Sequence, residues 1–159
     1  MRVPSRRFTG NAGLVAVLTL VAIQFVPYGR DHVNPPVVAE PEWDSPVTRV
    51  LAKQACFDCH SNETAWPAYA RVAPVSWLIQ RDVSKGRAVL NFSEWQRPQD
   101  ESREAAEEVL EGEMPLLIYR LMHSHARLSS GDRARLAEGL QRTLRRHATA
   151  RTSTSRNQR

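Results

Sequence analysis

The segment Cys56-Phe57-Asp58-Cys59-His60 constrains this chain more than any other. Two cysteines separated by two residues, with a histidine directly after the second, have the spacing of covalent haem attachment in c-type cytochromes. The thiols can reach the two vinyl groups on one edge of a porphyrin, and the next residue then brings an imidazole under the iron. Cys56 and Cys59 are the only cysteines among the 159 residues. The spacing therefore predicts one covalently bound haem c, with His60 as the proximal iron ligand.

Three other uses of these residues compete with haem attachment. A disulfide between Cys56 and Cys59 would close a very small loop and would stabilise the fold little. A thioredoxin-like redox pair would need a βαβ setting, whereas the surrounding sequence has helical or irregular patterns. A zinc site would need a fourth ligand, for which His123 and His125 are the candidates. We favour haem over all three.

A second iron ligand is expected on the face of the haem opposite His60, where methionine or histidine is usual. Met114 lies in an irregular step between helices, and the following proline favours an extended Met114 that can direct its thioether into a pocket. Met122 falls on a helical segment, where packing in the core is the default role. We therefore expect Met114 as the distal ligand. His123, His125 or an open site are the alternatives.

The haem also needs apolar walls and polar edges. The aromatic residues near the motif are candidates for the walls, namely Trp66, Tyr69, Trp77, Phe92 and Trp95. The candidates for charge-assisted pairing with the haem propionates are Arg71, Arg81 and Arg87. For each of these residues taken singly, ordinary core packing (the aromatic residues) or a solvated surface (the arginines) is the default expectation.

A long uncharged segment near the N-terminus predicts a membrane anchor. Arg2, Arg6 and Arg7 precede residues 8–29, which contain no charged residue. As a helix this segment would span roughly 33 Å, about the thickness of the hydrocarbon core of a bilayer. The arginines would keep the N-terminus in the cytoplasm. We therefore expect residues 1–29 to cross the bacterial inner membrane once, with the haem domain in the periplasm, where c-type attachment occurs. A cleaved signal peptide is the alternative.

The charges are unevenly distributed along the chain. The 22 Lys and Arg residues exceed the 17 Asp and Glu residues, which gives a net charge of +5. Nine of the basic residues lie near the two ends, whereas every acidic residue lies between Asp31 and Glu138. The middle of the chain therefore holds 13 basic against 17 acidic residues and is net acidic. Nucleic-acid binding needs a basic surface on the folded domain, so it is not expected.

The rest of the chain divides into three parts by composition. Residues 30–45 form a Pro-rich linker, in which Asn34-Pro35-Pro36 and Pro41 disfavour regular structure. Residues 46–147 carry the cysteine motif and the helical patterns, so we expect them to form the haem-binding domain. Residues 148–159 are polar and basic, and we expect a disordered tail there.

The domain is predicted to contain helices and no strand, and its fold class is therefore all-α. Ser45 and Pro46 indicate the N-cap and first position of a helix that ends near residue 54. Glycines at 86 and 112 should end two further helices. These two helices are predicted over residues 75–85 and 98–111. A short helical segment ending near residue 122 and a last helix from Ser129 or Ser130 to Arg146 follow. In this last helix Leu136, Leu140 and Leu144 recur every four residues, which predicts a face in the core.

Several blocks, in this order, resemble the bacterial haem-binding domain family, a small cytochrome c-like group. They are Ala55-Cys56-Phe57-Asp58-Cys59-His60-Ser61-Asn62-Glu63-Thr64, Trp66-Pro67, Ala73-Pro74-Val75-Ser76-Trp77-Leu78, Leu90-Asn91-Phe92-Ser93-Glu94-Trp95 and Gly112-Glu113-Met114-Pro115-Leu116. The resemblance covers roughly residues 35–140. It implies a small cytochrome c-like helical domain with one covalent haem c, His60 as proximal ligand and Met114 as distal ligand. Ala65, Ala68 and Ser124 depart from the family pattern, which leaves the pocket packing and the propionate contacts open.

Together these features predict a membrane-anchored monohaem c-type cytochrome that passes single electrons between periplasmic redox proteins. With protein ligands on both faces of the iron, no substrate would reach it, and catalysis is not expected. The acidic middle of the chain favours redox partners with a basic docking surface. The alternative function is a haem sensor or haem enzyme with an exchangeable distal ligand.

Overall fold

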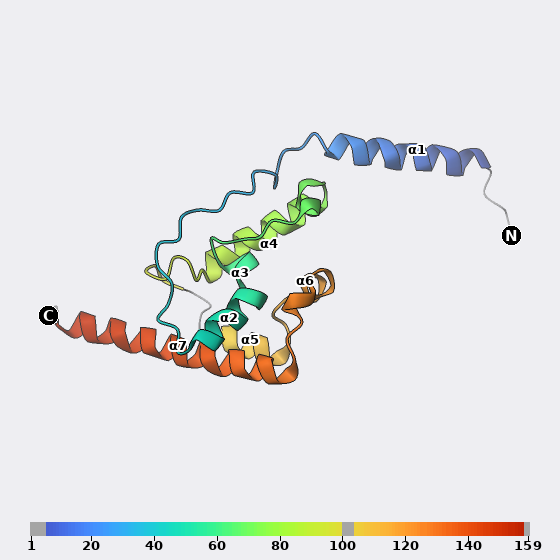
Figure 1. The fold of residues 1–159 in the computed structure, drawn as a ribbon. Coiled ribbons are helices and arrows are strands. Elements are labelled where there is room, and N and C mark those ends of the chain that lie inside the picture. The colour runs from blue at the N-terminus through green and yellow to red at the C-terminus, as the bar shows by residue number, and fades with distance from the viewer. Residues whose placement is uncertain (1–5, 100–103, 158–159) are drawn as a thin grey trace. The chain divides into compact units, whose positions relative to one another are not determined.

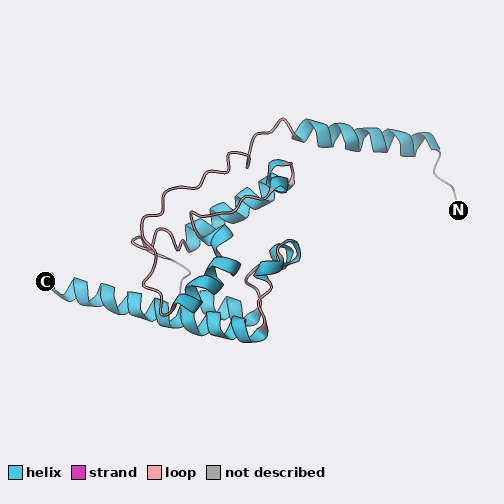
Figure 2. Cartoon of the chain, viewed as in Figure 1, coloured by secondary structure: helices cyan, strands magenta, loops and turns pink. Residues whose placement is uncertain are grey.

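The computed structural model of the chain describes residues 6–99 and 104–157. Over these ranges every regular element is a helix, and the only sheet-like feature is an isolated bridge between Ala39 and Glu94 (Figure 2). The predicted all-α class is confirmed. The elements drawn in Figure 1 are α1 (Arg6–Ile23), α2 (Pro46–Ala55), α3 (Phe57–His60), η1 (Ala68–Arg71), α4 (Val75–Val89), α5 (Ala105–Glu111), α6 (Leu117–Met122), η2 (Ser124–Ala126) and α7 (Ser130–Asn157).

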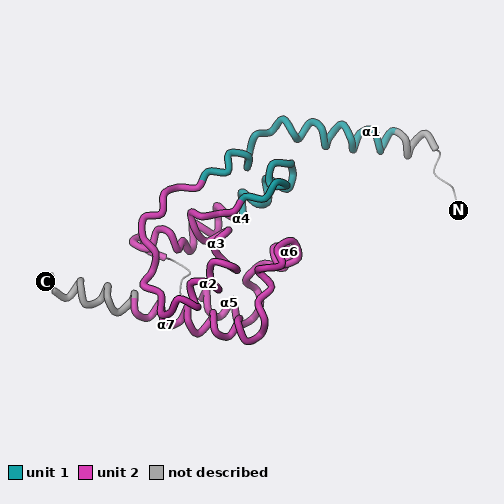
Figure 3. The backbone as a smooth tube through the Cα atoms, viewed as in Figure 1, with its two compact units in different colours: residues 1–33, 66–82 teal, residues 34–65, 83–159 magenta. Residues whose placement is uncertain are grey.

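The chain forms two compact units, which Figure 3 distinguishes by colour. Unit 1 consists of Met1–Val33 and Trp66–Asp82, and unit 2 consists of Asn34–Ala65 and Val83–Arg159. Within unit 1, the Gln24 side chain bonds both backbone groups of Ala73. Its Nε2 donates to the Ala73 carbonyl at 2.9 Å, and its Oε1 accepts from the Ala73 N–H at 3.0 Å. The Cys56–His60 motif and Met114 both belong to unit 2.

Helix α2 begins where the sequence predicts. Ser45 is the N-cap, its side chain accepts from the Thr48 N–H at 3.2 Å, and Pro46 follows at the start of the helix. This cap satisfies one of the N–H groups that a helix start leaves unpaired. One face of the helix is buried, and it carries Thr48, Leu51, Ala52 and Ala55.

The core of unit 2 forms where α2 and α5 pack against α7. Phe92 lies at its centre, with its ring centroid 5.1 Å from that of Trp43, 5.6 Å from Phe57 and 5.9 Å from Trp95. The predicted leucine face of the last helix is confirmed, because Leu136 and Leu140 are fully buried and Leu144 packs against the same core. Burial of a side chain of this size stabilises the fold by about 1.5–3 kcal/mol.

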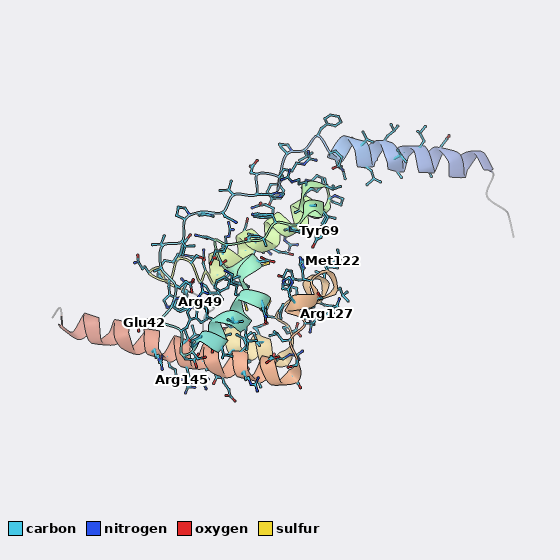
Figure 4. The ribbon with its side chains drawn as sticks, viewed as in Figure 1. Glu42, Arg49, Tyr69, Met122, Arg127 and Arg145 are labelled. Carbon is cyan, nitrogen blue, oxygen red and sulfur yellow. The ribbon has the colours of Figure 1, made fainter. Side chains whose placement is uncertain are left out.

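Residues 34–45 lack helix and strand, as predicted, but they pack against the rest of unit 2. The Asn34 side chain donates to the Thr64 carbonyl at 2.9 Å, and the Val38 N–H donates to the Ser93 carbonyl at 2.9 Å. Arg49, labelled in Figure 4, makes two bonds of 2.7 and 2.6 Å to the Glu40 carboxylate. The bond from Arg49 lowers the pKa of Glu40, against the opposing effect of burial. Residues 34–45 are therefore held by these contacts and do not act as a free linker.

Two helix boundaries differ from the prediction. Pro98 and Gln99 are not helical, and α5 begins at Ala105. The Gln99 side chain holds this region as a loop, because its Oε1 accepts from the Asn91 N–H at 2.8 Å and its Nε2 donates to the Glu94 carbonyl at 2.9 Å. Residues 100–103, also part of the predicted helix, lie outside the described ranges. At the other end of α5, Gly112 has φ 82°, which confirms the predicted left-handed stop.

Helix α7 continues past its predicted end at Arg146 and reaches Asn157. The disordered tail predicted over 148–159 is therefore wrong for residues 148–157, and residues 158–159 lie outside the described ranges. No Gly or Pro follows Gly139 in the sequence, so no strong helix breaker interrupts this segment.

Helix α1 is shorter than the membrane anchor that the sequence predicts. It ends at Ile23, and the N–H groups of Gln24, Phe25 and Val26 bond carbonyls only three residues earlier, before Pro27. The uncharged helical part, residues 8–23, is about 24 Å long at 1.5 Å per residue, less than the ~30 Å hydrocarbon core. Within the described residues no helix has both the length and the apolar character needed to cross a membrane. The predicted transmembrane helix over residues 1–29 is not supported.

Gly139 in α7 faces Thr48 in α2, and the space between them excludes a side chain. A Cβ atom at position 139 would overlap Thr48 Oγ1 and would lie 2.6 Å from Thr48 Cγ2. We expect Gly139→Ala to lower the free energy of unfolding by about 1–2 kcal/mol, because overpacking outweighs the gain in helix propensity. Urea denaturation followed by circular dichroism measures the change.

Gly131→Ala is the matched control, since the nearest side-chain atom to a Cβ there is Ser129 Oγ at 3.9 Å. We expect this variant to be as stable as the wild type or slightly more stable. Equal stability of the Gly139→Ala and Gly131→Ala variants would contradict the close packing of α2 on α7.

Candidate functional site

The Cys56–His60 motif directly continues α2. The Cys56 N–H donates to the Ala52 carbonyl at 2.8 Å, and the Cys56 carbonyl then accepts from the His60 N–H at 2.8 Å as the first bond of α3. Phe57 is 2% exposed and fixes the short helix to the aromatic core. This anchor leaves both cysteines and His60 only partly buried. The motif is therefore rigid in its backbone while its chemically active side chains remain reachable.

One cavity in unit 2 brings Met114 together with Cys56 and His60, from which it is far apart in the sequence. Its walls come from the end of α4, the following loop, α5 and α7. The apolar members are Ala55, Val89, Leu90, Phe92, Ala105, Val109, Pro115 and Leu140, and the carboxylates are Glu104 and Glu108. A thiol, an imidazole and a thioether on the walls of a mainly apolar cavity match the groups that hold haem iron and porphyrin vinyl groups. The residues present therefore fit a haem.

The imidazole of His60 is oriented by the backbone. Its Nδ1 donates to the Leu90 carbonyl at 3.1 Å, because a carbonyl oxygen can only accept. This bond fixes the tautomer with the proton on Nδ1 and places the coordinating lone pair on Nε2. A second bond, from the Phe92 N–H to the His60 carbonyl at 2.8 Å, holds the backbone of the histidine to the same loop. Outer hydrogen bonds of this kind orient metal-ligating histidines.

The loop that carries Leu90 is itself held by buried polar contacts. Asn91 Nδ2 donates to Asn62 Oδ1 at 2.9 Å, and Asn91 Oδ1 accepts from the Ser93 N–H at 2.9 Å. Ser93 Oγ in turn accepts from the Asn62 N–H at 2.9 Å. These three residues are 3% exposed or less. The bonds form a closed ring between the segment after the motif and the loop, so the Leu90 carbonyl cannot shift independently of His60.

Helix α4 approaches the motif at Gly86. A Cβ atom on Gly86 would overlap the carbonyl oxygen of Cys59 and would lie 3.2 Å from Cys59 Cβ. The sequence predicts that α4 ends near Gly86, but the helix continues to Val89. The glycine is therefore inside the helix, where it allows close packing instead of terminating the helix. Cys59 is held by this contact and is not among the residues that line the cavity.

Met114, the predicted distal ligand, lies on the cavity wall. Its N–H donates to the Glu108 carbonyl at 3.1 Å, and its side chain packs against the core of unit 2. Met122 was expected in the core, and this expectation is wrong, because its side chain is 56% exposed at the end of α6 (Figure 4). The apolar pattern of α6 misled the prediction, since no residue of this short helix is buried.

The competing uses of the cysteines receive no support. Cys56 and Cys59 form no disulfide. Burial, together with the neighbouring Cys59, raises the pKa of the Cys56 thiol to about 12. Among the described residues, no group of three or more His, Cys, Asp or Glu side chains is arranged to hold a metal ion.

His123 and His125 lie around Tyr119 and do not line the cavity. The His123 ring stacks on the Tyr119 ring with centroids 4.2 Å apart, and His125 Nε2 lies 3.4 Å from the phenol oxygen. The Tyr119 hydroxyl donates to Asp58 Oδ2 at 2.6 Å. Burial, with the Asp58 carboxylate, raises the pKa of this phenol above its usual range. Neither histidine is placed as the distal ligand, and the link from Tyr119 to the motif is not predictable from the sequence.

Arg87, one of the candidates for pairing with a propionate, bonds protein groups around the motif. Its Nε donates to the Ser61 carbonyl at 2.8 Å, and its terminal nitrogen donates to Asn34 Oδ1 and Thr64 Oγ1, both at 2.9 Å. Of the aromatic candidates, Phe92 lines the cavity, whereas Trp95 packs in the core beside it. The remaining candidates belong to unit 1, namely Trp66, Tyr69, Arg71, Trp77 and Arg81.

Comparison with known proteins agrees with this arrangement. The family model described as "Haem-binding domain" matches residues 18–142, well over half of the chain. No curated protein and no solved structure matches the chain. The chain therefore belongs to the haem-binding domain family, and it binds haem.

The close approach of α4 to the motif generates a prediction. We expect Gly86→Ala to displace the Cys59 backbone, to lower the free energy of unfolding by about 1–3 kcal/mol and to reduce the haem content of the purified protein. Absorbance of the haem relative to protein concentration measures the second effect. Gly131→Ala, which adds the same methyl group in open space, should keep full haem content. Full haem content in both variants would contradict the role of Gly86.

Proposed function

We propose that this member of the haem-binding domain family is a monohaem c-type cytochrome that carries single electrons in the periplasm. The observation that supports this most directly is the cavity whose walls include Cys56, His60 and Met114. The three residues supply a thiol for covalent attachment and one ligand for each face of an iron. The second thiol, Cys59, is one helical turn from Cys56 in the spacing that porphyrin attachment needs.

In the proposed attachment, each cysteine forms one thioether bond. The sulfur of Cys56 or Cys59 bonds to one carbon of a vinyl group, and the thiol hydrogen goes to the other carbon. The addition consumes one C=C bond per cysteine and needs no oxidant or reductant. Neither cysteine forms a disulfide, so both keep the S–H group that this addition requires.

The chain's own residues would hold the two axial positions. His60, with its proton on Nδ1 and its lone pair on Nε2, is the proposed proximal ligand. Met114 is the proposed distal ligand, and a thioether in this position raises the reduction potential. When bound, the haem supplies an iron that alternates between the ferrous and ferric states by one electron. With both axial positions held by protein, we expect electron transfer and not catalysis.

The walls of the cavity favour a buried porphyrin face. Side chains such as Val89, Val109 and Leu140 give the proposed site an apolar wall, and apolar surroundings strengthen the influence of nearby charges on the potential. Glu104 and Glu108 are the carboxylates of the same cavity. Negative charge close to an iron stabilises its more positive ferric state, so these two residues oppose the effect of a methionine ligand.

The proposed location is the periplasmic side of the bacterial inner membrane. Covalent haem attachment of this type occurs there, and the CxxCH spacing is what connects the chain with that chemistry. The proposed partners are other redox proteins with a basic docking surface, because the middle of the chain carries more acidic than basic residues. Complexes of this kind are usually small and short-lived.

Replacement of the cysteines tests covalent attachment. Wild-type protein made together with the haem-attachment machinery should keep its haem after denaturation and should give a c-type pyridine haemochrome spectrum. The double variant Cys56→Ala/Cys59→Ala should lose its haem to acidic organic solvent, because no thioether remains. Extractable haem in the wild type would refute c-type attachment and leave non-covalent binding as the family's haem mode.

Replacement of the methionines tests the distal ligand. Met114→Ala should abolish the ferric methionine-to-iron charge-transfer band, and its reduced form should bind carbon monoxide rapidly. Met122→Ala is the control, since Met122 is 56% exposed and lies outside the cavity. It should keep the wild-type spectrum. Rapid binding of carbon monoxide by the reduced wild type at neutral pH would instead favour a sensor or enzyme with an open distal site.

A further inference from the structure

The hydrogen bond between Tyr119 and Asp58 joins the two sides of the candidate site. Asp58 lies inside the motif, two residues before His60, and Tyr119 lies five residues after Met114. The distance of 2.6 Å between Tyr119 Oη and Asp58 Oδ2 is in the range of a charge-assisted O–H···O⁻ bond. It directly connects the helix that carries the proximal ligand with the segment that carries the distal one.

Asp58 is well placed to accept this bond. Its other carboxylate oxygen, Oδ1, accepts from the Ala65 N–H at 2.9 Å, and its backbone carbonyl accepts from Thr64 Oγ1 at 2.8 Å. These contacts tie the carboxylate to the backbone that follows the motif. The acceptor is therefore fixed to α3 and its surroundings, so the Tyr119 hydroxyl bonds to a rigid part of unit 2.

Helix α6 depends on polar contacts for its position, because none of its side chains is fully buried. Its apolar residues are between 56% and 64% exposed, namely Leu117, Ile118, Leu121 and Met122. After α6, the fully buried Ala126 fixes η2 to the domain. Before α6, the Met114 N–H bonds the Glu108 carbonyl. Between these two points the Tyr119–Asp58 bond attaches α6 to the motif.

We propose that Tyr119 is a positioning residue that holds the Met114 segment closed over the haem by bonding Asp58. The Tyr119 ring is itself restrained, because His123 stacks on it and the His123 Nδ1 bonds the Tyr119 carbonyl at 3.1 Å. The bond closes a loop from the motif through α6 to Met114. Without it, the segment can move away from the cavity more often, and an external ligand can replace the thioether. This inference rests on Met114 as the distal ligand.

The test is a titration of the ferric holoprotein with imidazole, which competes with methionine for the iron. Tyr119→Phe removes only the hydroxyl. We expect the variant to keep the methionine-to-iron band without imidazole, and to bind imidazole at least about tenfold more tightly than the wild type, since a bond to a charged acceptor is lost. Tyr28→Phe, the same change at a half-exposed tyrosine of unit 1, should leave the affinity unchanged.

A second variant identifies the partner of Tyr119. If Asp58 is the acceptor, the double variant Tyr119→Phe/Asp58→Ala should bind imidazole with the affinity of Asp58→Ala alone. Fully additive effects would overturn the proposal, because the two residues would then act separately. If Asp58→Ala does not retain haem, the comparison of Tyr119→Phe with the wild type and with Tyr28→Phe decides the question by itself.

The outcomes separate this inference from the proposed function. Unchanged imidazole affinity in Tyr119→Phe, with the methionine-to-iron band present in the wild type, overturns the positioning role and leaves Met114 as the ligand. Absence of that band from the wild type overturns both. A loss of stability on denaturation without a change in imidazole affinity also overturns the inference, because it indicates a purely structural role.

Discussion

The hydrogen bond from His60 Nδ1 to the Leu90 carbonyl determines how the candidate site is arranged. A histidine that follows two cysteines can swing freely unless its second nitrogen is held, and a backbone carbonyl holds it without adding charge. The position of the Leu90 carbonyl is well defined only because its loop is fixed by the buried ring of hydrogen bonds among Asn62, Asn91 and Ser93. Removal of one member of this ring would leave buried polar groups unpaired, at a cost of about 1–3 kcal/mol each. The aromatic core and the polar ring thus together hold the His60 imidazole in its orientation.

The features that the sequence predicted correctly depend on neighbours in the chain. The Cys56–His60 spacing, the Ser45 cap and the Gly112 stop are local patterns, and the backbone follows them. Met114 lines the same cavity as His60, and its assignment as the distal ligand, from the proline after it and from the resemblance to the family, stays a prediction. Helix ends were less predictable where tertiary contacts decide them. Gly86 has the sequence character of a helix stop, yet packing against Cys59 keeps it inside α4.

Other parts of the site come from contacts between distant residues that no local pattern encodes. A tyrosine in an apolar hexapeptide gives no indication that its hydroxyl will meet Asp58, 61 positions earlier. The same hexapeptide suggested a core helix, and Met122 was assigned accordingly, but an apolar pattern describes only which side chains would benefit from burial. Whether a face is covered depends on the rest of the fold. The prediction of a membrane anchor was unsupported for a similar reason. The absence of charge over residues 8–29 does not reveal that the helix ends at Ile23.

The two proposed axial ligands are held by contacts of different strength. His60 is fixed by a side-chain bond, a backbone bond to Phe92 and the buried Phe57 beside it. Met114 is fixed by one backbone bond to α5 and by packing of a flexible side chain, and the helix after it buries nothing. Local opening follows the regions with the fewest buried contacts, so it should begin on the Met114 side. A change at the iron would therefore leave His60 in place and exchange the distal ligand first. One fold thus combines a fixed proximal side with a distal side whose closure depends on a few polar bonds.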